Sequence, residues 1–416
     1  MTGGDRGGFA ALDTCVHCGF CLQACPTFLA TGDEADSPRG RILLMRALEQ
    51  GELAADAPDL TTHLDRCLGC RACEPVCPSG VGYGRGLEAA REVITDKRGA
   101  SLLARLALWA LTTPGVSGVV YGLARLLRST GLPAGLAGWS RFGFAMGMLA
   151  ATKQGRTEAD GGGRRRTNAS PPLPALLFRG CVMQGLFRHV HDATIRTLAV
   201  NGYAVREAMA GVCCGALHAH AGLADEARAL ARANVAAFTN GGDEPIVVNS
   251  AGCGALMKEY GHLVGDEHAE RFGARVRDVS ELLAGDALKG PAAGAPLDLH
   301  VAYDPPCHLV HAQRVAAQPL KMFAAIPLLE LVPVPGAAEC CGSAGLFTLL
   351  EPEMSRAVLT TKLEGIREAA PQVVATGNPG CIMQLGAGLA AARIPARVRH
   401  PVELLDDSYR VAGRYE

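Results

Sequence analysis

Short apolar runs rich in β-branched residues recur in the C-terminal half of the chain. Each run ends in a turn that contains glycine or proline, and a cysteine and a helical pattern follow. The runs lie at residues 174–178, 245–249, 299–303 and 372–376. A strand, a cysteine turn and a helix in this order are typical of α/β folds, in which sites lie at the carboxyl ends of parallel strands. The pattern therefore predicts α/β domains with cysteines at their strand ends.

An uncharged apolar stretch, residues 106–124, lies between two arginines. Its length is close to that of a membrane span, but Pro114 and Gly115 interrupt its centre. The aromatic side chains of this region that favour membrane interfaces are Trp109, Tyr121 and Trp139. We expect two short helices that lie on a membrane surface or contact a partner protein, with a buried helical hairpin as the alternative.

Cysteine content divides the chain into segments. Residues 1–100 hold eight of the sixteen cysteines, and residues 101–150 hold none. Glycines, an arginine triplet and prolines make residues 151–175 typical of a solvated linker. The other eight cysteines fall in two units of similar length, residues 176–290 and 291–416. The sequence therefore predicts a multidomain α+β protein, in which a helical N-terminal domain and an apolar helical segment precede a duplicated α/β domain.

Charge and cysteine usage narrow the function. The 416 residues carry 40 Lys+Arg against 41 Asp+Glu, so a general nucleic-acid role, which needs a basic excess, is not supported. Residues 1–14 contain no apolar stretch of the kind found in signal peptides. Every cysteine lies inside a motif, and a chain of this length needs no disulfides for stability. We therefore expect metal-binding cysteines and a cytoplasmic location.

The N-terminal cysteines form two copies of the run Cys-x-x-Cys-x-x-Cys-x-x-x-Cys-Pro. They are Cys15, Cys18, Cys21 and Cys25 in the first copy, and Cys67, Cys70, Cys73 and Cys77 in the second. This spacing is that of bacterial ferredoxins with two 4Fe–4S clusters, in which the fourth cysteine of each run binds the other cluster. A zinc site, which is the alternative, usually uses two separated Cys-x-x-Cys pairs.

The ferredoxin spacing predicts crossed ligand sets. We expect one cluster on Cys15, Cys18, Cys21 and Cys77, and the other on Cys67, Cys70, Cys73 and Cys25. Gly19 and Gly69 lie between ligands, where a side chain would crowd the cluster and the N–H can reach a sulfur. We expect His17 and Arg71, also inside the loops, to be surface residues.

A helix is predicted between the two cysteine runs. Residues 37–41 read Ser-Pro-Arg-Gly-Arg, and apolar residues follow at helical spacing as far as Leu48. We expect this helix to pack over the clusters. Arg39 and Arg41 either offset the negative charge of thiolate-bound iron or form a solvated basic turn.

The C-terminal cysteines form a second pair of matching sets, each with a single cysteine, a Cys-Cys-Gly and a final cysteine. The sets are Cys181, Cys213, Cys214 and Cys253, and Cys307, Cys340, Cys341 and Cys381. Matching cysteines are 126, 127 and 128 residues apart, so a domain-sized unit is duplicated. Four thiols suffice for one cluster or one zinc ion, and buried inert thiols are the alternative.

Both sets resemble the cysteine-rich CCG domain. That domain occurs in heterodisulfide reductases, in anaerobic glycerol-3-phosphate dehydrogenase, and in the iron–sulfur subunits of lactate and glycolate oxidases. Over nearly the whole chain, the order of motifs is most similar to the glycolate oxidase iron–sulfur subunits. Segments that carry this resemblance are residues 249–262, 304–313 and 340–345.

The chain departs from the CCG pattern at two positions. The family pattern ends in Cys-x-x-Cys, whereas Ser250 and Asn378 replace the first of these two cysteines here. Heterodisulfide reductases use five cysteines per cluster to cleave disulfides, and this chain has four per copy. A conventional cluster or a remnant site therefore fits better than disulfide chemistry.

Histidines beside the second motifs have two interpretations. They either tune a metal site and relay protons, or they are satisfied polar residues at helix starts, which we favour. The histidines concerned are His218, His220, His308 and His311.

The resemblance implies an electron-transfer subunit of a glycolate oxidase, with no substrate-oxidising site on this chain. No Gly-x-Gly-x-x-Gly follows a predicted strand, so the FAD is expected on partner subunits. Electrons then pass from the flavin through the two clusters to a quinone or another membrane acceptor. A lactate or glycerol-3-phosphate dehydrogenase subunit, a thiol/disulfide enzyme and a scaffold are the alternatives. We expect a peripheral position on the inner face of the cell membrane.

Overall fold

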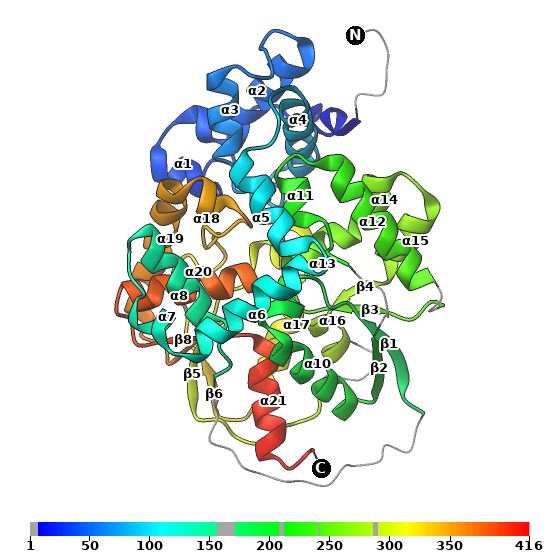
Figure 1. Ribbon diagram of the computed structural model, residues 1–416, viewed down its shortest axis with the longest axis vertical. Helices are drawn as coiled ribbons and strands as arrows, with labels where there is room; N and C mark the ends of the chain where they lie inside the picture. Colours follow the sequence, from blue (N-terminus) through cyan, green and yellow to red (C-terminus); the bar gives the residue numbers. More distant parts are fainter. Residues whose placement is uncertain (1–6, 156–170, 208–211, 240–241, 286–289, 416) are drawn as a thin grey trace.

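The computed structural model describes the chain from residue 7 to residue 415 with four internal gaps (Figure 1). The described ranges are residues 7–155, 171–207, 212–239, 242–285 and 290–415. The N-terminal part and the apolar segment are helical, and two parallel β-sheets with their helices form the rest. The centre of the predicted linker, residues 156–170, lies outside the described residues, and the first strand already begins at Leu173, within that predicted linker.

The N-terminal part places its two cysteine loops between short helices. Its elements are η1 (Gly7–Leu12), α1 (Pro26–Thr31), η2 (Glu34–Asp36), α2 (Pro38–Gln50), α3 (Pro58–Asp65) and α4 (Tyr83–Arg98). The helix predicted after residue 37 is α2. The hydroxyl of Ser37 accepts a hydrogen bond from the backbone N–H of Gly40, and Gly51, with a φ of 77°, ends the helix. Apolar side chains of α2 share one buried core with Cys67 and Cys73, so the helix packs against a cysteine loop.

The apolar segment forms short helices, as the sequence predicts. They are α5 (Leu102–Thr112), α6 (Val116–Ser129), α7 (Leu132–Gly135) and α8 (Arg141–Ala151). Proline and a left-handed glycine, Gly115 with a φ of 83°, separate α5 from α6, and the two helices meet at 86°. Within the described residues, no single helix has both the length and the apolar composition to cross a membrane; only α5 and α6 together reach them, across the bend.

The C-terminal half contains two parallel four-stranded sheets with the same topology, which confirms the predicted α/β architecture. One sheet has the order β2-β1-β3-β4 and the other β6-β5-β7-β8. The strands are β1 (Leu173–Leu177), β2 (Tyr203–Glu207), β3 (Ile246–Val248), β4 (Val276–Asp278), β5 (Leu299–Tyr303), β6 (Leu329–Leu331), β7 (Val373–Ala375) and β8 (Arg397–Arg399). The four apolar runs of the sequence correspond to β1, β3, β5 and β7, the inner strands of the two sheets.

Helices cover both sheets. In the first repeat they are α9 (Val182–Leu186), α10 (Arg188–Val200), α11 (Ala216–His220), α12 (Ala224–Phe238), α13 (Ala251–Lys258), α14 (Tyr260–Val264), α15 (Glu267–Arg275) and α16 (Val279–Leu283). In the second they are η5 (His308–Ala312), α17 (Ala317–Ala324), α18 (Phe347–Leu350), α19 (Pro352–Ala369), α20 (Pro379–Ala391) and α21 (Pro401–Val411).

The two repeats share one hydrophobic core. Buried side chains of both sheets, among them Val247 and Val301, belong to the same cluster. The C-terminal helix α21 of the second repeat packs against α10 of the first (Figure 1), where Arg196 donates two hydrogen bonds to Asp406 at 2.9 and 2.6 Å. The repeats therefore form one unit that fixes the relative positions of their strand ends.

Candidate metal centres

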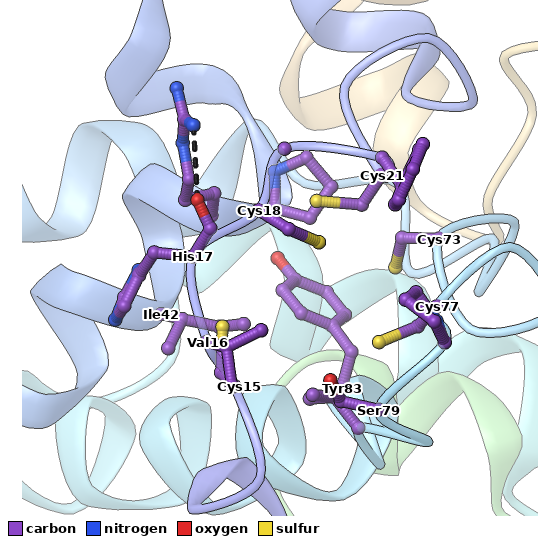
Figure 2. A pocket seen from close by; sticks show the side chains of 16 residues that line it. Cys15, Val16, His17, Cys18, Cys21, Ile42, Cys73, Cys77, Ser79 and Tyr83 are labelled. Carbon is purple, nitrogen blue, oxygen red and sulfur yellow. Dashed lines mark hydrogen bonds between the residues drawn. The ribbon is translucent and has the colours of Figure 1, made fainter.

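Four predicted ligands surround a pocket of about 430 Å³ in the N-terminal part. Figure 2 shows the sulfur atoms of Cys15, Cys18, Cys21 and Cys77 around this space, with Cys73 facing it from the neighbouring loop. Cys77 belongs to the second cysteine run, yet it lies with the first three cysteines of the first run. This is the grouping that the crossed ligand sets require.

A second pocket, of about 300 Å³, lies beside the first. The cysteines that line it are Cys25, Cys67, Cys70 and Cys73. Cys25, from the first run, again joins the first three cysteines of the other run. Cys73 lines both pockets, so the two groups of thiols are neighbours.

Both loops reach this geometry with the same backbone conformation. His17 and Gly69, each directly before the second cysteine, have φ values of 54° and 61°. Gly19 and Arg71, each directly after it, have φ values of 86° and 59°. Two left-handed residues in each loop turn the chain around a single centre, although only one of the two is glycine in each case.

Hydrogen-bond donors and cations surround the sulfur atoms of the second pocket. The backbone N–H of Gly69 lies 3.5 Å from the sulfur of Cys67, as expected, and the Tyr83 hydroxyl lies 3.4 Å from it. Burial alone would raise the pKa of Cys67, but Arg41 and Arg91 bring it below its ordinary value. Donors and cations of this kind stabilise a thiolate ligand.

Arg41 is a buried cation rather than part of a solvated turn. It is fully buried, forms an ion pair with Asp36 at 3.2 Å and donates to the Thr27 hydroxyl at 2.9 Å. Its guanidinium also lies 3.9 Å from the sulfur of Cys25. Burial would lower the pKa of Arg41, but the surrounding thiols and Asp36 raise it, so the charge is retained. This position offsets negative charge on the thiolates.

The other residues singled out in the loops have structural roles. Arg39 pairs with Glu34 at 2.8 Å and donates to the carbonyl of His17, holding the first loop. Arg71 was expected at the surface, and this is wrong. It lies between domains and pairs with Glu74 and with Glu259 of the first α/β repeat, both at 2.9 Å.

The four cysteines of the first repeat converge at the carboxyl ends of its strands. Cys181 follows β1, Cys213 and Cys214 follow β2, and Cys253 lies in α13 after β3. The sulfur atoms of Cys181 and Cys213 are 3.5 Å apart, and those of Cys214 and Cys253 are 3.2 Å apart. Contact with Cys213, followed by burial, raises the pKa of Cys181 well above its ordinary value.

The second repeat repeats this arrangement with four buried cysteines. They are Cys307, Cys340, Cys341 and Cys381. The backbone N–H of Gly342 lies 3.5 Å from the sulfur of Cys340, and the side-chain amide of Asn378 donates to the sulfur of Cys381 at 3.4 Å. Contact with Cys341, followed by burial, raises the pKa of Cys381.

The donor sets fit thiolate-bound metal. All sixteen cysteines lie in the described residues, and none of them forms a disulfide. They gather instead into four groups of four thiols, with sulfur atoms in contact in places. Several free thiolates so close together in a buried site would repel, so the sites favour a bound cation or cluster that compensates their charge. Iron–sulfur clusters and zinc ions are the groups that sets of four cysteines bind.

Three histidines beside the second motifs, His220, His308 and His311, have lowered pKa values that favour the neutral ring. Burial lowers the pKa of His220 to about 3 and that of His308 to about 4. Their rings pack edge to face, with centroids 5.4 Å apart, and His308 lies 3.6 Å from the sulfur of Cys307. His311 contacts the carbonyl of Ala338 at 3.1 Å. His311 is thus a satisfied polar residue, whereas His308 contacts the sulfur of a candidate ligand, and Nδ1 of the buried His218 has no hydrogen-bond partner in the described part of the chain.

Several residues near the thiols were not found from the sequence. Arg91 donates to the carbonyl of Cys67 at 2.6 Å, and the buried Lys362 pairs with Asp304 close to Cys341. Tyr83, the first residue of α4, follows the second Cys-Pro and belongs to no motif. Because each of these contacts joins distant parts of the chain, no local signal identifies them.

Known proteins resemble the chain in both halves. A family model described as a 4Fe-4S dicluster domain matches residues 11–81, and one described as a cysteine-rich domain matches residues 175–258 and 301–386. The probable glycolate oxidase iron-sulfur subunit of Bacillus subtilis is 32% identical, over 96% of this chain and 94% of its own length. The glycolate oxidase iron-sulfur subunit of Escherichia coli is also 32% identical, over 95% and 94%. Lactate utilization protein A of Geobacillus kaustophilus is 30% identical over 55% of this chain and 97% of its own.

Replacement of Arg41 by methionine should destabilise the N-terminal part by about 2–3 kcal/mol, because Asp36 loses its fully buried partner and keeps only the more exposed His63 and Arg66. The matched control is Arg39→Met, which removes a solvent-screened ion pair and should change the free energy of unfolding far less. Denaturant unfolding of the two variants measures the difference. Equal stabilities would contradict the assigned role of Arg41.

Proposed function

Because this chain belongs to the family of glycolate oxidase iron–sulfur subunits, we propose that it is the electron-transfer subunit of a glycolate-oxidising complex. It takes electrons singly from an FAD on partner subunits and passes them to a quinone or another membrane acceptor. The observation that carries this proposal is the pair of adjacent four-thiol pockets in the N-terminal part.

Those pockets would hold two 4Fe–4S clusters with crossed ligands. Cys15, Cys18, Cys21 and Cys77 serve one, and Cys67, Cys70, Cys73 and Cys25 serve the other. Such clusters accept and release single electrons when bound. The protein's part is to hold the two groups side by side, to supply donors to the sulfur atoms and to exclude water from the second pocket. Arg41 and Arg91 supply the positive charge that favours thiolate ligands there.

The four thiols of each α/β repeat would hold a further four-ligand group. The positions at which disulfide-cleaving relatives carry another cysteine are occupied by Ser250 and Asn378. Their side chains lie 3.4 Å apart, and the Asn378 amide already bonds to Cys381. An electron-carrying site is therefore favoured over a thiol/disulfide enzyme.

The bent pair α5 and α6 would hold the subunit at the cytoplasmic face of the membrane. Large apolar side chains stand exposed at helical spacing on both helices: Leu102, Leu106 and Trp109 on α5, and Val119, Leu123 and Leu126 on α6. Arginines flank them, and no Asp or Glu occurs from residue 97 to residue 157. In Figure 1 both helices lie on the outside of the molecule. Apolar side chains with positive flanks suit an interface of anionic lipids.

Exchange of the fourth cysteine in each run tests the crossed ligand sets. Cys77→Ser should remove the cluster on Cys15, Cys18 and Cys21, and Cys25→Ser the cluster on Cys67, Cys70 and Cys73, each with loss of about four iron atoms. Electron paramagnetic resonance (EPR) of the two reduced proteins should then show two different surviving signals. Cys18→Ser and Cys70→Ser, which each remove a ligand of a known loop, identify the two signals. Crossed ligands would be excluded if Cys77→Ser lost the same signal as Cys70→Ser, and Cys25→Ser the same signal as Cys18→Ser.

Reconstitution with the flavin subunits tests the proposed function. Glycolate added to the anaerobic complex should bleach the cluster absorbance of this chain and then reduce a soluble quinone analogue. Without the chain, the flavin should be reduced and the quinone left oxidised. Equal quinone reduction without this chain would contradict the proposal.

Charge placed on the apolar face should release the protein from membranes. The double variant Leu106→Glu, Trp109→Glu should weaken co-sedimentation with vesicles of anionic lipid about tenfold or more, because two apolar side chains that would insert into the lipid are lost. Leu328→Glu is the control, because Leu328 is 68% exposed but lies far along the chain in the second repeat. Equal binding by both variants would show that α5 does not face the lipid.

A further inference from the structure

The second N-terminal pocket lies against the cysteines of the second α/β repeat. Cys70, which lines this pocket, packs on a hydrophobic cluster of buried side chains that contains Cys307 and Cys340 together with Leu68 and Phe347. The proximity is also electrostatic: after burial, Cys340 is the next largest cause of the raised pKa of Cys70. No such contact joins Cys70 to a cysteine of the first repeat among the described residues. The thiol Cys70 therefore lies against thiols of the second repeat, whereas its neighbours Gly69 and Arg71 contact His220 and Glu259 of the first repeat, which are not cysteines.

The two repeat sites are in turn joined through Asn378. Its side-chain N–H donates to the sulfur of Cys381, in the second repeat, at 3.4 Å. Its side-chain oxygen accepts a hydrogen bond from the backbone N–H of Gly252 at 3.2 Å. Gly252 directly precedes Cys253 of the first repeat. The Asn378 amide therefore links the sulfur of Cys381 in one site to Gly252, the residue before the candidate ligand Cys253 of the other site.

The surrounding backbone holds this bridge in place. The hydroxyl of Ser250 lies 3.4 Å from the same oxygen of Asn378, and the N–H of Ala251 donates to the carbonyl of Gly377 at 3.1 Å. Asn378 and Ser250 occupy corresponding positions of the two repeats, so the bridge is formed by the two residues that depart from the cysteine pattern. An amide can donate to one site and accept from the other at once, which a thiol ligand at this position does not do.

The first repeat lies on the side of the proposed membrane face. The ring of Tyr121, on α6, packs on Gly185, where a Cβ would meet it at 2.5 Å. After burial, Cys181 and Cys213 are the groups that raise the pKa of Tyr121. Helix α6 thus covers the cysteines of the first repeat, and its outer side carries the exposed apolar residues.

We propose that electrons leave the ferredoxin-type pockets at Cys70, enter the second repeat first, and cross to the first repeat through Asn378. This inference rests on the proposed function and adds its internal route and its exit side. Each transfer moves one electron: the donor site loses it, the next site gains it, and no bond forms or breaks. Asn378 is a positioning residue, since it couples the two sites and raises the potential of the second by its hydrogen bond to Cys381.

Asn378→Leu tests the route, because leucine is similar in size and removes both hydrogen bonds. The matched control is Gln313→Leu. Gln313 donates across the same interface, to the carbonyl of Ala251 at 2.9 Å, but has no contact with a cysteine sulfur. Both variants should keep the iron content and circular dichroism of the wild-type protein, with EPR signals assigned through Cys181→Ser and Cys307→Ser.

Rapid freeze-quench EPR after anaerobic reduction follows the order in which the sites fill. In the wild-type protein and in Gln313→Leu, the second-repeat signal should appear before the first-repeat signal. In Asn378→Leu, electron arrival at the first repeat should slow about tenfold or more, while the ferredoxin-type signals are unchanged. Redox titration should also show a lower potential for the second-repeat site in this variant only.

Three results would overturn the route. They are arrival at the first repeat before the second, equal transfer rates in Asn378→Leu and Gln313→Leu, and an iron content of about eight with no signal from the repeats. The last result would leave the proposed function intact, because the two ferredoxin-type clusters would still carry electrons. Absence of all cluster signals would instead contradict both the route and the proposed function.

Discussion

The structure depends on the cost of placing many thiols close together away from water. Two left-handed residues in each N-terminal loop, and the carboxyl ends of parallel strands in each repeat, direct four cysteines to one point. Burial raises the pKa of Cys70 and Cys73 well above the ordinary value, so these two thiols resist ionisation, whereas Arg41 and Arg91 lower the pKa of Cys67 beside them. Arg41 and Asp36 show how far the fold goes to balance that charge: an ion pair is kept in full burial beside Cys25. Burying such a pair costs desolvation free energy, and removing one partner costs stability because the other charge stays buried.

Duplication gives two similar sites in different surroundings. In α12 of the first repeat, Asn234 donates to the carbonyl of Cys213 at 2.9 Å, whereas in α19 of the second repeat Lys362 pairs with the buried Asp304. The second repeat contacts the N-terminal part through the thiols Cys307 and Cys340, whereas the first contacts it through other residues, such as Glu259, and lies under α6. The differences suit one site that receives electrons from inside the molecule and one that lies close to the proposed membrane face.

The features of this protein that could be predicted from the sequence are those marked by residues close together along the chain. The cysteine spacings, the helix after residue 37 and the inner strands β1, β3, β5 and β7 were predicted, because motif spacing and fully apolar runs show themselves within a few residues. The edge strands β2, β4, β6 and β8 were not predicted, because each contains charged residues, such as Arg206 in β2 and Arg397 in β8, and none is a fully apolar run. The ion pair of Arg71 with Glu259 joins residues 188 positions apart, so its burial could not be read from the loop. Asn378 was recognised as a departure from a pattern, but its contact with Gly252 requires the two repeats to be placed together.

The central claim is that the two N-terminal pockets hold two 4Fe–4S clusters, and that the fourth cysteine of each run binds the cluster of the other run. Iron and acid-labile sulfide analysis of the anaerobically purified chain, with EPR of its reduced form, tests this most directly. About eight iron atoms and eight sulfides per chain, or more if the repeats are filled, with the signals of two interacting clusters, are the predicted result. Fewer than about four iron atoms and no cluster signal would contradict it.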